Sequence, residues 1–130
     1  MEMASNGKSV TVGWFEIPVN DMDRAVLFYN NIFEIALAKQ DFGGLSMAWF
    51  PWNETSKEAG GSLIQSDRYA PRHEGTLVYF SSEDAEIEIN RVEEAGGKVF
   101  QKKTEISPQI GYMALFEDSE ENRIALHSKE

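Results

Sequence analysis

The sequence of 130 residues contains no cysteine, only two histidines and few basic residues. Without cysteine, disulfides, thiolate nucleophiles and zinc-thiolate sites are all excluded. The 12 Lys and Arg residues stand against 22 Asp and Glu residues, which gives a formal net charge of -10. Because that charge repels a polyphosphate backbone and no basic cluster offsets it, nucleic acid is not an expected partner.

The sequence also lacks the long apolar run of a membrane span, about 18 residues, and the start of a secretory leader. We therefore expect no membrane partner and a cytoplasmic location. It has no glycine-rich phosphate loop and no Gly-x-Ser-x-Gly motif, so nucleotide and acyl-transfer chemistry have no support. Hydrophobic residues make up 42% of the chain. That is enough for the core of one domain, which we place at residues 10–130 after a disordered N-terminus at residues 1–9.

The chain contains two similar halves. The apolar run from Trp14 to Asp21 matches the run from Leu77 to Asp84 at an offset of 63 residues. Asp21 and Asp84 are favourable N-cap residues, so each run is expected to be a strand followed by a helix. Apolar residues recur at helical spacing after both caps, at Met22, Val26, Tyr29 and Ile32 and at Ala85, Ile89, Val92 and Ala95. The glycines at 96 and 97 are a helix stop signal.

Two further matches continue the repeat. Residues 47–50 recur at 113–116, and residues 63–66 recur at 125–128 with an offset of 62. Any one match is weak, but three blocks in the same order predict a β-α-β-β-β unit that occurs twice. We therefore expect an α+β fold with module one at residues 10–66, a linker at 67–75 and module two at 76–130.

These residues resemble the vicinal oxygen chelate superfamily, which includes glyoxalase I, extradiol dioxygenases and bleomycin-resistance proteins. The resemblance lies in residues 15–19, 21–25, 28–29, 94–99 and 118–128. It implies two tandem βαβββ modules that form a curved mixed sheet around a central cleft, and a homodimer. It also implies that Glu121 stands where relatives have glycine, at a cost of up to about 1 kcal/mol if the backbone there has a positive φ.

Metal enzymes of that superfamily take one ligand from the first and one from the last strand of each half. The resemblance places these four positions at Trp14, Leu63, Leu77 and Ala125. Indole and alkyl groups cannot compete with water for a cation, so we expect neither a metal nor another cofactor.

A polar ring lies next to the four apolar positions. Side chains two apart on a strand share a face, which adds Glu16, Gln65, Tyr79 and His127. Apolar walls with a few convergent polar groups are typical of ligand sites. The predicted ligand-binding residues are therefore Trp14, Glu16, Leu63, Gln65, Leu77, Tyr79, Ala125 and His127.

Two residues of the ring are candidates for catalysis. A carboxylate within the apolar run around Glu16 would be partly desolvated and would suit a general base, and His127 could orient it or act as an acid. The structural alternatives are a Glu16 paired with a neighbouring Arg or His, and a His127 satisfied by ordinary contacts. Glu16 and His127 could also hold an adventitious metal. The other imidazole, His73, lies in the linker.

Three functions remain open at this point. The first is metal-independent binding of a small organic molecule in the cleft between the modules. The alternative is a lyase or isomerase acting on a small carbonyl compound, with Glu16 as base and Tyr79 or His127 holding the oxyanion. The third is an interaction module with a vestigial cleft.

Overall fold

Two copies of a β-α-β-β-β unit follow one another in the computed structural model, which describes residues 7, 10–42, 44–53, 55 and 58–130. Module one contains β1 (Trp14–Pro18), α1 (Met22–Phe33), β2 (Ala38–Phe42), β3 (Leu45–Trp49) and β4 (Gly60–Gln65). Module two contains β5 (Val78–Ser81), α2 (Ala85–Ile89), α3 (Val92–Ala95), β6 (Lys98–Ser107), β7 (Gly111–Glu117) and β8 (Arg123–Ser128). The predicted α+β fold with two tandem modules is confirmed.

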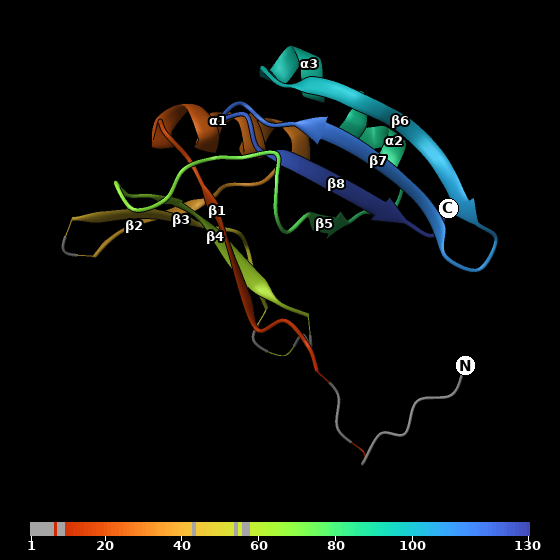
Figure 1. The fold of residues 1–130 in the computed structure, drawn as a ribbon, viewed down its shortest axis with the longest axis horizontal. Helices are drawn as coiled ribbons and strands as arrows, with labels where there is room; N and C mark the ends of the chain where they lie inside the picture. The colour runs from red at the N-terminus through yellow and green to blue at the C-terminus, as the bar shows by residue number, and fades with distance from the viewer. Residues whose placement is uncertain (1–6, 8–9, 43, 54, 56–57) are drawn as a thin grey trace.

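The modules have the same strand order. Each forms a four-stranded mixed sheet, β1-β4-β3-β2 in module one and β5-β8-β7-β6 in module two. The first strand pairs in parallel with the last, and the other pairs are antiparallel. Figure 1 shows the two sheets beside each other, with the helices gathered along one side. Residues 66–77, between β4 and β5, form no helix or strand.

The module and linker boundaries drawn from the sequence stay a prediction. Most of the segment expected to be disordered, residues 1–9, lies outside the described residues.

The helices begin where the sequence predicts. The Asp21 carboxylate accepts a hydrogen bond from the Arg24 N–H at 3.1 Å, and the Asp84 carboxylate accepts one from the Glu86 N–H at 3.0 Å. The second helix is interrupted at residues 90–91, so α2 and α3 replace a continuous helix, and α3 ends at Gly96 with a φ of 109°. Within the described residues, no helix is long and apolar enough to cross a membrane.

Both modules contribute to one hydrophobic core. Apolar residues of α1, such as Phe28 and Ile32, belong to the same buried cluster as Phe116 and Leu126 of module two. Phe80 of β5 lies at the junction, with its ring centroid 5.0–6.2 Å from the rings of module one. The rings concerned are Phe15, Tyr29, Phe33 and Phe50. The modules are therefore held together by the same kind of packing that stabilises each of them.

The turn between β7 and β8 adds a polar contact between the modules. The carboxylate of Glu120, whose side chain is fully buried, accepts hydrogen bonds from the N–H groups of Asn20 and Asp21, both at 2.8 Å. The Arg24 guanidinium donates to it as well, with Nε 2.6 Å from Oε2. Glu120 of module two thus accepts hydrogen bonds from backbone N–H groups at the start of α1 in module one.

Neighbouring residues of the same turn extend this contact. The Tyr29 hydroxyl donates to the buried Asp118 carboxylate at 2.7 Å, and the Asn122 amide donates to the Pro18 carbonyl at 2.7 Å. Burial raises the pKa of Asp118, and burial beside Asp118 raises the pKa of Tyr29 well above its usual value. These titratable groups support the fold and face no pocket among those found in the described residues.

Glu121 has a φ of 70°, so the condition that the family resemblance attached to this position is met and the residue is strained. We predict that Glu121→Gly raises the free energy of unfolding by up to about 1 kcal/mol, because glycine adopts a positive φ without a Cβ clash. Urea unfolding followed by circular dichroism measures the change. Glu121→Ala, which keeps the Cβ, is the matched control and should bring no such gain. A Glu121→Gly protein less stable than Glu121→Ala would contradict the prediction.

Candidate functional site

In module two, the predicted residues share one face of the sheet. Tyr79 pairs with Ala125 across β5 and β8, and Ser81 pairs with His127, so the side chains of these four residues lie on one side. Leu77 directly precedes β5, so the strand pairing does not assign its side chain to a face. Tyr79 is 50% exposed, whereas Ala125 is fully buried. The common face predicted for Tyr79, Ala125 and His127 is therefore observed, and their role in ligand binding stays a prediction.

In module one, the shared face predicted from the sequence needs a correction. Trp14 pairs with Gly60 and Glu16 pairs with Ser62, whereas Leu63 pairs with Ile17 in the core. Leu63 and Gln65 therefore lie on the opposite face from Trp14 and Glu16. The match of residues 63–66 with 125–128 is one residue out of register, and one residue reverses the face of a strand. Ser62 and Ile64 occupy the positions equivalent to Ala125 and His127.

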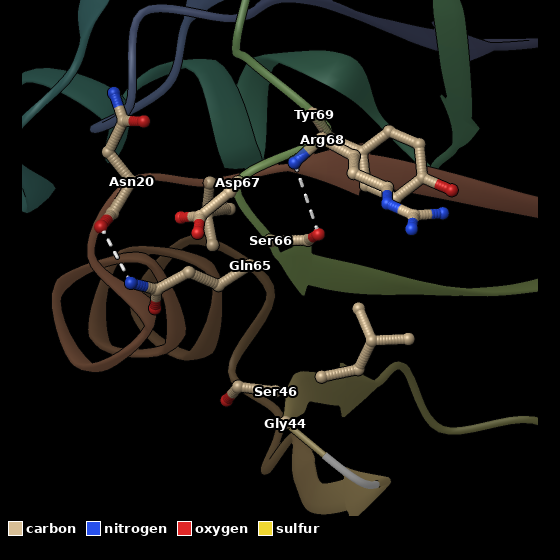
Figure 2. Close-up of a pocket in the computed structure, with 10 residues that line it drawn as sticks. Asn20, Gly44, Ser46, Gln65, Ser66, Asp67, Arg68 and Tyr69 are labelled. Carbon is tan, nitrogen blue, oxygen red and sulfur yellow. Dashed lines mark hydrogen bonds between the residues drawn. The ribbon is translucent and has the colours of Figure 1, made fainter.

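Gln65 has a structural partner instead. Its Oε1 accepts a hydrogen bond from the Met22 N–H at 3.0 Å, and its Nε2 donates to the Asn20 carbonyl at 2.9 Å. Figure 2 shows this side chain at the edge of a polar pocket of about 760 Å³, which Ser46, Arg68 and Tyr69 also line. Gln65 thus fixes the start of α1, and it lies away from Glu16.

Glu16 and His127 are not hydrogen-bonded to each other. Glu16 is exposed, so the desolvation expected of it is not found, and its carboxylate has no hydrogen bond or ion pair within the described residues. The Nε2 atom of His127 lies 2.7 Å from the Ile110 carbonyl oxygen. His73 contacts Glu117, with its Nε2 atom 2.6 Å from Oε2. Of the two structural alternatives, an ordinary contact describes His127, and no neighbouring Arg or His pairs with Glu16.

The four positions implied for metal ligands hold poor ligands after the correction as well. Ser62 replaces Leu63 in the set of four, whose other members stay Trp14, Leu77 and Ala125. Its hydroxyl is a weaker metal ligand than imidazole or carboxylate. Within the described residues, no group of three or more His, Cys, Asp or Glu side chains is placed to hold a metal ion. The residues at these positions therefore do not fit the metal that the superfamily's enzymes carry.

Aromatic side chains gather on the face of module one that carries Glu16. The rings of Trp14 and Trp49 meet edge to face at 5.9 Å. A Cβ added at Gly60 would lie 2.9 Å from the Trp52 ring and 3.0 Å from Trp14, so the glycine makes room for both indoles. Trp14 is 41% exposed. This face offers aromatic surface in place of metal ligands.

An apolar cleft lies between the modules. It has a volume of about 810 Å³ and runs between the start of β1 and β4 on one side and β5 on the other. Aromatic and aliphatic side chains form most of its walls, namely Val12, Phe15, Phe33, Ile35, Phe50, Leu77, Val78 and Phe80. Of the predicted site residues, Leu77 and Tyr79 line it. Its size and apolar lining are those of a small-molecule site.

A smaller and more polar pocket adjoins this cleft. It has a volume of about 220 Å³ and shares Thr76 and Val78 of the β5 side with the larger cleft. Its charged lining consists of Glu16, Arg72, Glu74 and Arg123. The Nε atom of Arg123 is buried and has no hydrogen-bond partner within the described residues.

The sequence prediction missed Arg123 and the phenylalanine walls of the cleft. Arg123 lies two residues before Ala125, so it belongs to the same face of β8. The alternation of side chains along the strand is the signal that points to it. The phenylalanines gave no such signal, because aromatic residues on strands are more often core than cleft.

Solved structures show the class of fold to which this arrangement belongs. A glyoxalase/bleomycin resistance protein/dioxygenase domain from a Frankia species is 16% identical, with a TM-score of 0.71, and the alignment covers 95% of this chain and 100% of that one. A glyoxalase/bleomycin resistance protein from Albidiferax ferrireducens is 14% identical, with a TM-score of 0.71, over 92% of this chain and 98% of that one.

Glyoxalase I from Zea mays is 18% identical, with a TM-score of 0.68, over 94% of this chain and 48% of that one. The chain thus spans about half the length of the Zea mays enzyme. No curated protein matches the chain.

Residues 11–126 match the family model of the Glyoxalase/Bleomycin resistance protein/Dioxygenase superfamily. The chain belongs to this superfamily. The resemblance drawn from the sequence motifs is confirmed. Membership of the superfamily does not specify the substrate.

Proposed function

We propose that this protein binds a small organic molecule, without a metal, in the apolar cleft between its two modules. The observation that carries the proposal is the cleft of about 810 Å³, lined by phenylalanines of both modules. Burying an apolar ligand there releases roughly 25 cal/mol per Å² of apolar surface removed from water. The absence of strong ligands at Trp14, Ser62, Leu77 and Ala125 supports binding that does not depend on a cation.

Few polar side chains line the cleft, namely Thr11, Glu58, Thr76, Tyr79 and Ser81. Tyr79 lines the larger cleft and is half exposed, so its hydroxyl is available to a ligand. Glu16 lines the adjoining pocket. His127, Ala125 and Trp14 line neither pocket within the described residues, and their role in binding stays a prediction.

The alternative function, a lyase or isomerase with Glu16 as base, has less support. Glu16, the base in that mechanism, is exposed. The Nε2 atom of His127 is already in hydrogen-bond contact with the Ile110 carbonyl oxygen. The homodimer and the cytoplasmic location expected from the sequence also stay predictions.

We predict that Thr76→Trp weakens the binding of a neutral aromatic probe, 2-naphthylacetamide, at least tenfold. Thr76 is exposed and lines both pockets, so an indole there fills space that the probe needs. Isothermal titration calorimetry measures the affinity before and after dialysis against EDTA, and the wild-type affinity should be the same in both.

Thr104→Trp is the matched control, because Thr104 is exposed on β6 and lines neither pocket. It should leave the affinity unchanged. The proposal is overturned if the probe does not bind the wild type, or if EDTA abolishes binding and a divalent cation restores it. Equal affinities of the Thr76→Trp and Thr104→Trp proteins would also sink it.

A further inference from the structure

We infer that the ligand of this cleft is a monocarboxylate, with its apolar body between the modules and its carboxylate on Arg123. The inference rests on the proposed function and names the ligand class. It starts from an unusual feature, a guanidinium that lies between the modules with no anionic partner in the described residues.

Arg123 lacks the partner that its position in the sheet would give it. It is paired directly with Glu117 across β8 and β7, and opposite charges at such positions usually attract. The Glu117 carboxylate instead contacts His73 at 2.6 Å. Within the described residues, no ion pair and no side-chain hydrogen bond joins Arg123 to any acidic group. Arg123, the less exposed of the two arginines that line this pocket, therefore has no counter-ion within the described residues.

The Arg123 side chain also has an unmet hydrogen bond. A buried donor without a partner is destabilising, and such groups are rare enough to need an explanation. The Arg72 carbonyl accepts a hydrogen bond from the Arg123 backbone N–H at 3.4 Å, and the side-chain Nε makes none within the described residues. Nε has no accessible surface in this structure, so a ligand reaches it only when the Arg123 side chain turns toward the pocket. A carboxylate then satisfies the guanidinium well, because two parallel N–H···O bonds match its geometry.

The charges around the pocket are balanced, so they tolerate one added negative charge better than two. Two arginines, Arg72 and Arg123, are balanced by two carboxylates, Glu16 and Glu74. One ligand carboxylate gives this group a net charge of -1, whereas a phosphate dianion would bring stronger repulsion in a chain whose net charge is already -10. The volume of about 220 Å³ leaves room for a short acidic group.

The position where the two pockets meet indicates what is attached to the ligand's carboxylate. Both are lined by Thr76 and Val78, so a molecule that contacts Arg123 can continue along β5 into the apolar cleft. A carboxylate joined to an aromatic or aliphatic body has this combination of groups.

The test compares two probes of the same shape, 2-naphthylacetate and 2-naphthylacetamide, by calorimetry on the full chain. The wild type should bind the acid at least tenfold more tightly than the amide. Arg123→Gln should remove that preference and leave the amide affinity within twofold. Arg123→Lys should restore part of it, because lysine keeps the charge and loses the two-pronged geometry. Arg68→Gln, at the separate polar pocket of Figure 2, should change neither affinity.

The outcomes separate the two proposals. If both probes bind equally well and Arg123→Gln changes neither, the carboxylate inference fails and the proposed function stands. The inference also fails if the acid is preferred to the same degree with Arg123→Gln, because another cation then recognises it. If neither probe binds the folded wild type, both proposals are overturned. Circular dichroism shows whether Arg123→Gln is folded, and Arg123→Lys provides the comparison if it is not.

Discussion

Glu120→Gln is expected to lower the free energy of unfolding by about 2 to 3 kcal/mol, because buried charge-assisted hydrogen bonds are lost. The wild-type carboxylate accepts from the N–H groups of Asn20 and Asp21 and from two nitrogens of Arg24. Glutamine has the same shape but one acceptor oxygen, and its amide N–H groups must face donors. Urea unfolding at pH 7, followed by circular dichroism, gives the difference.

The control is Arg24→Gln, which removes the exposed partner of the same pair. The Arg24 side chain is 53% exposed, so water replaces much of what is lost, and the cost should be about 1 kcal/mol or less. If Arg24→Gln proves as costly as Glu120→Gln, the stability lies in the ion pair and the backbone contacts add little.

The pH dependence of the same variant provides a second measurement. Burial alone would raise the pKa of Glu120, but the hydrogen bonds from Arg24 and from the backbone of Asp21 and Asn20 outweigh it and lower the pKa. A lowered pKa stabilises the fold above the unfolded value of about 4.3, and this stability is lost as pH falls through the folded value. The difference between wild type and Glu120→Gln should therefore be full at pH 7 and shrink below pH of about 4.3. A difference that grows with acidity would contradict this sign.

The features that the sequence predicted well are those with a local physical signal. Asp21 and Asp84 each follow an apolar run and precede a helical pattern. A carboxylate at that position is favourable as a helix N-cap. The positive φ of Glu121 had no such local signal: the family resemblance gave it only as a condition, and the φ of 70° meets that condition. The order of strands and helices came from the repeat, which needs no knowledge of distant contacts.

The face assignment of β4 could not be predicted, because this strand has no alternation of polar and apolar residues. All residues from Gly60 to Ile64 are buried, on both faces of the sheet. A strand buried on both sides shows a continuous apolar run, and its sequence then does not distinguish a register from one shifted by a residue. The conclusions about Leu63 and Gln65 depended on that register, whereas those about Tyr79 and His127 did not.

Glu16 and Arg123 show a second limit. The apolar neighbours of Glu16 predicted burial, yet β1 is an edge strand with a partner, β4, on one side, and this carboxylate is exposed. Whether Arg123 has a counter-ion depends on His73, a linker residue 50 positions away that binds Glu117. Contacts of this kind are set by tertiary structure and leave no periodic pattern in the sequence.

Phe80→Ala is expected to lower the free energy of unfolding by about 3 kcal/mol, the lower end of the range for removing a core phenylalanine. The lower end applies because Phe80 is partly exposed toward the cleft. Its ring nevertheless packs against four aromatic rings of module one, between 5.0 and 6.2 Å away. The variant therefore removes the centre of the contact between the modules. Urea unfolding measures the loss.

Phe100→Ala is the matched control for this variant. Phe100 is 45% exposed, and its truncation should cost below about 1 kcal/mol. The three tryptophans, Trp14, Trp49 and Trp52, all lie in module one, so their fluorescence reports on that module, whereas circular dichroism reports on both. Because one core spans the two modules, the two signals should change at the same urea concentration in the wild type and in Phe80→Ala. Separate transitions in the wild type would show that the modules unfold independently, and a cost for Phe80→Ala no greater than for Phe100→Ala would show that the aromatic contact does not hold them together.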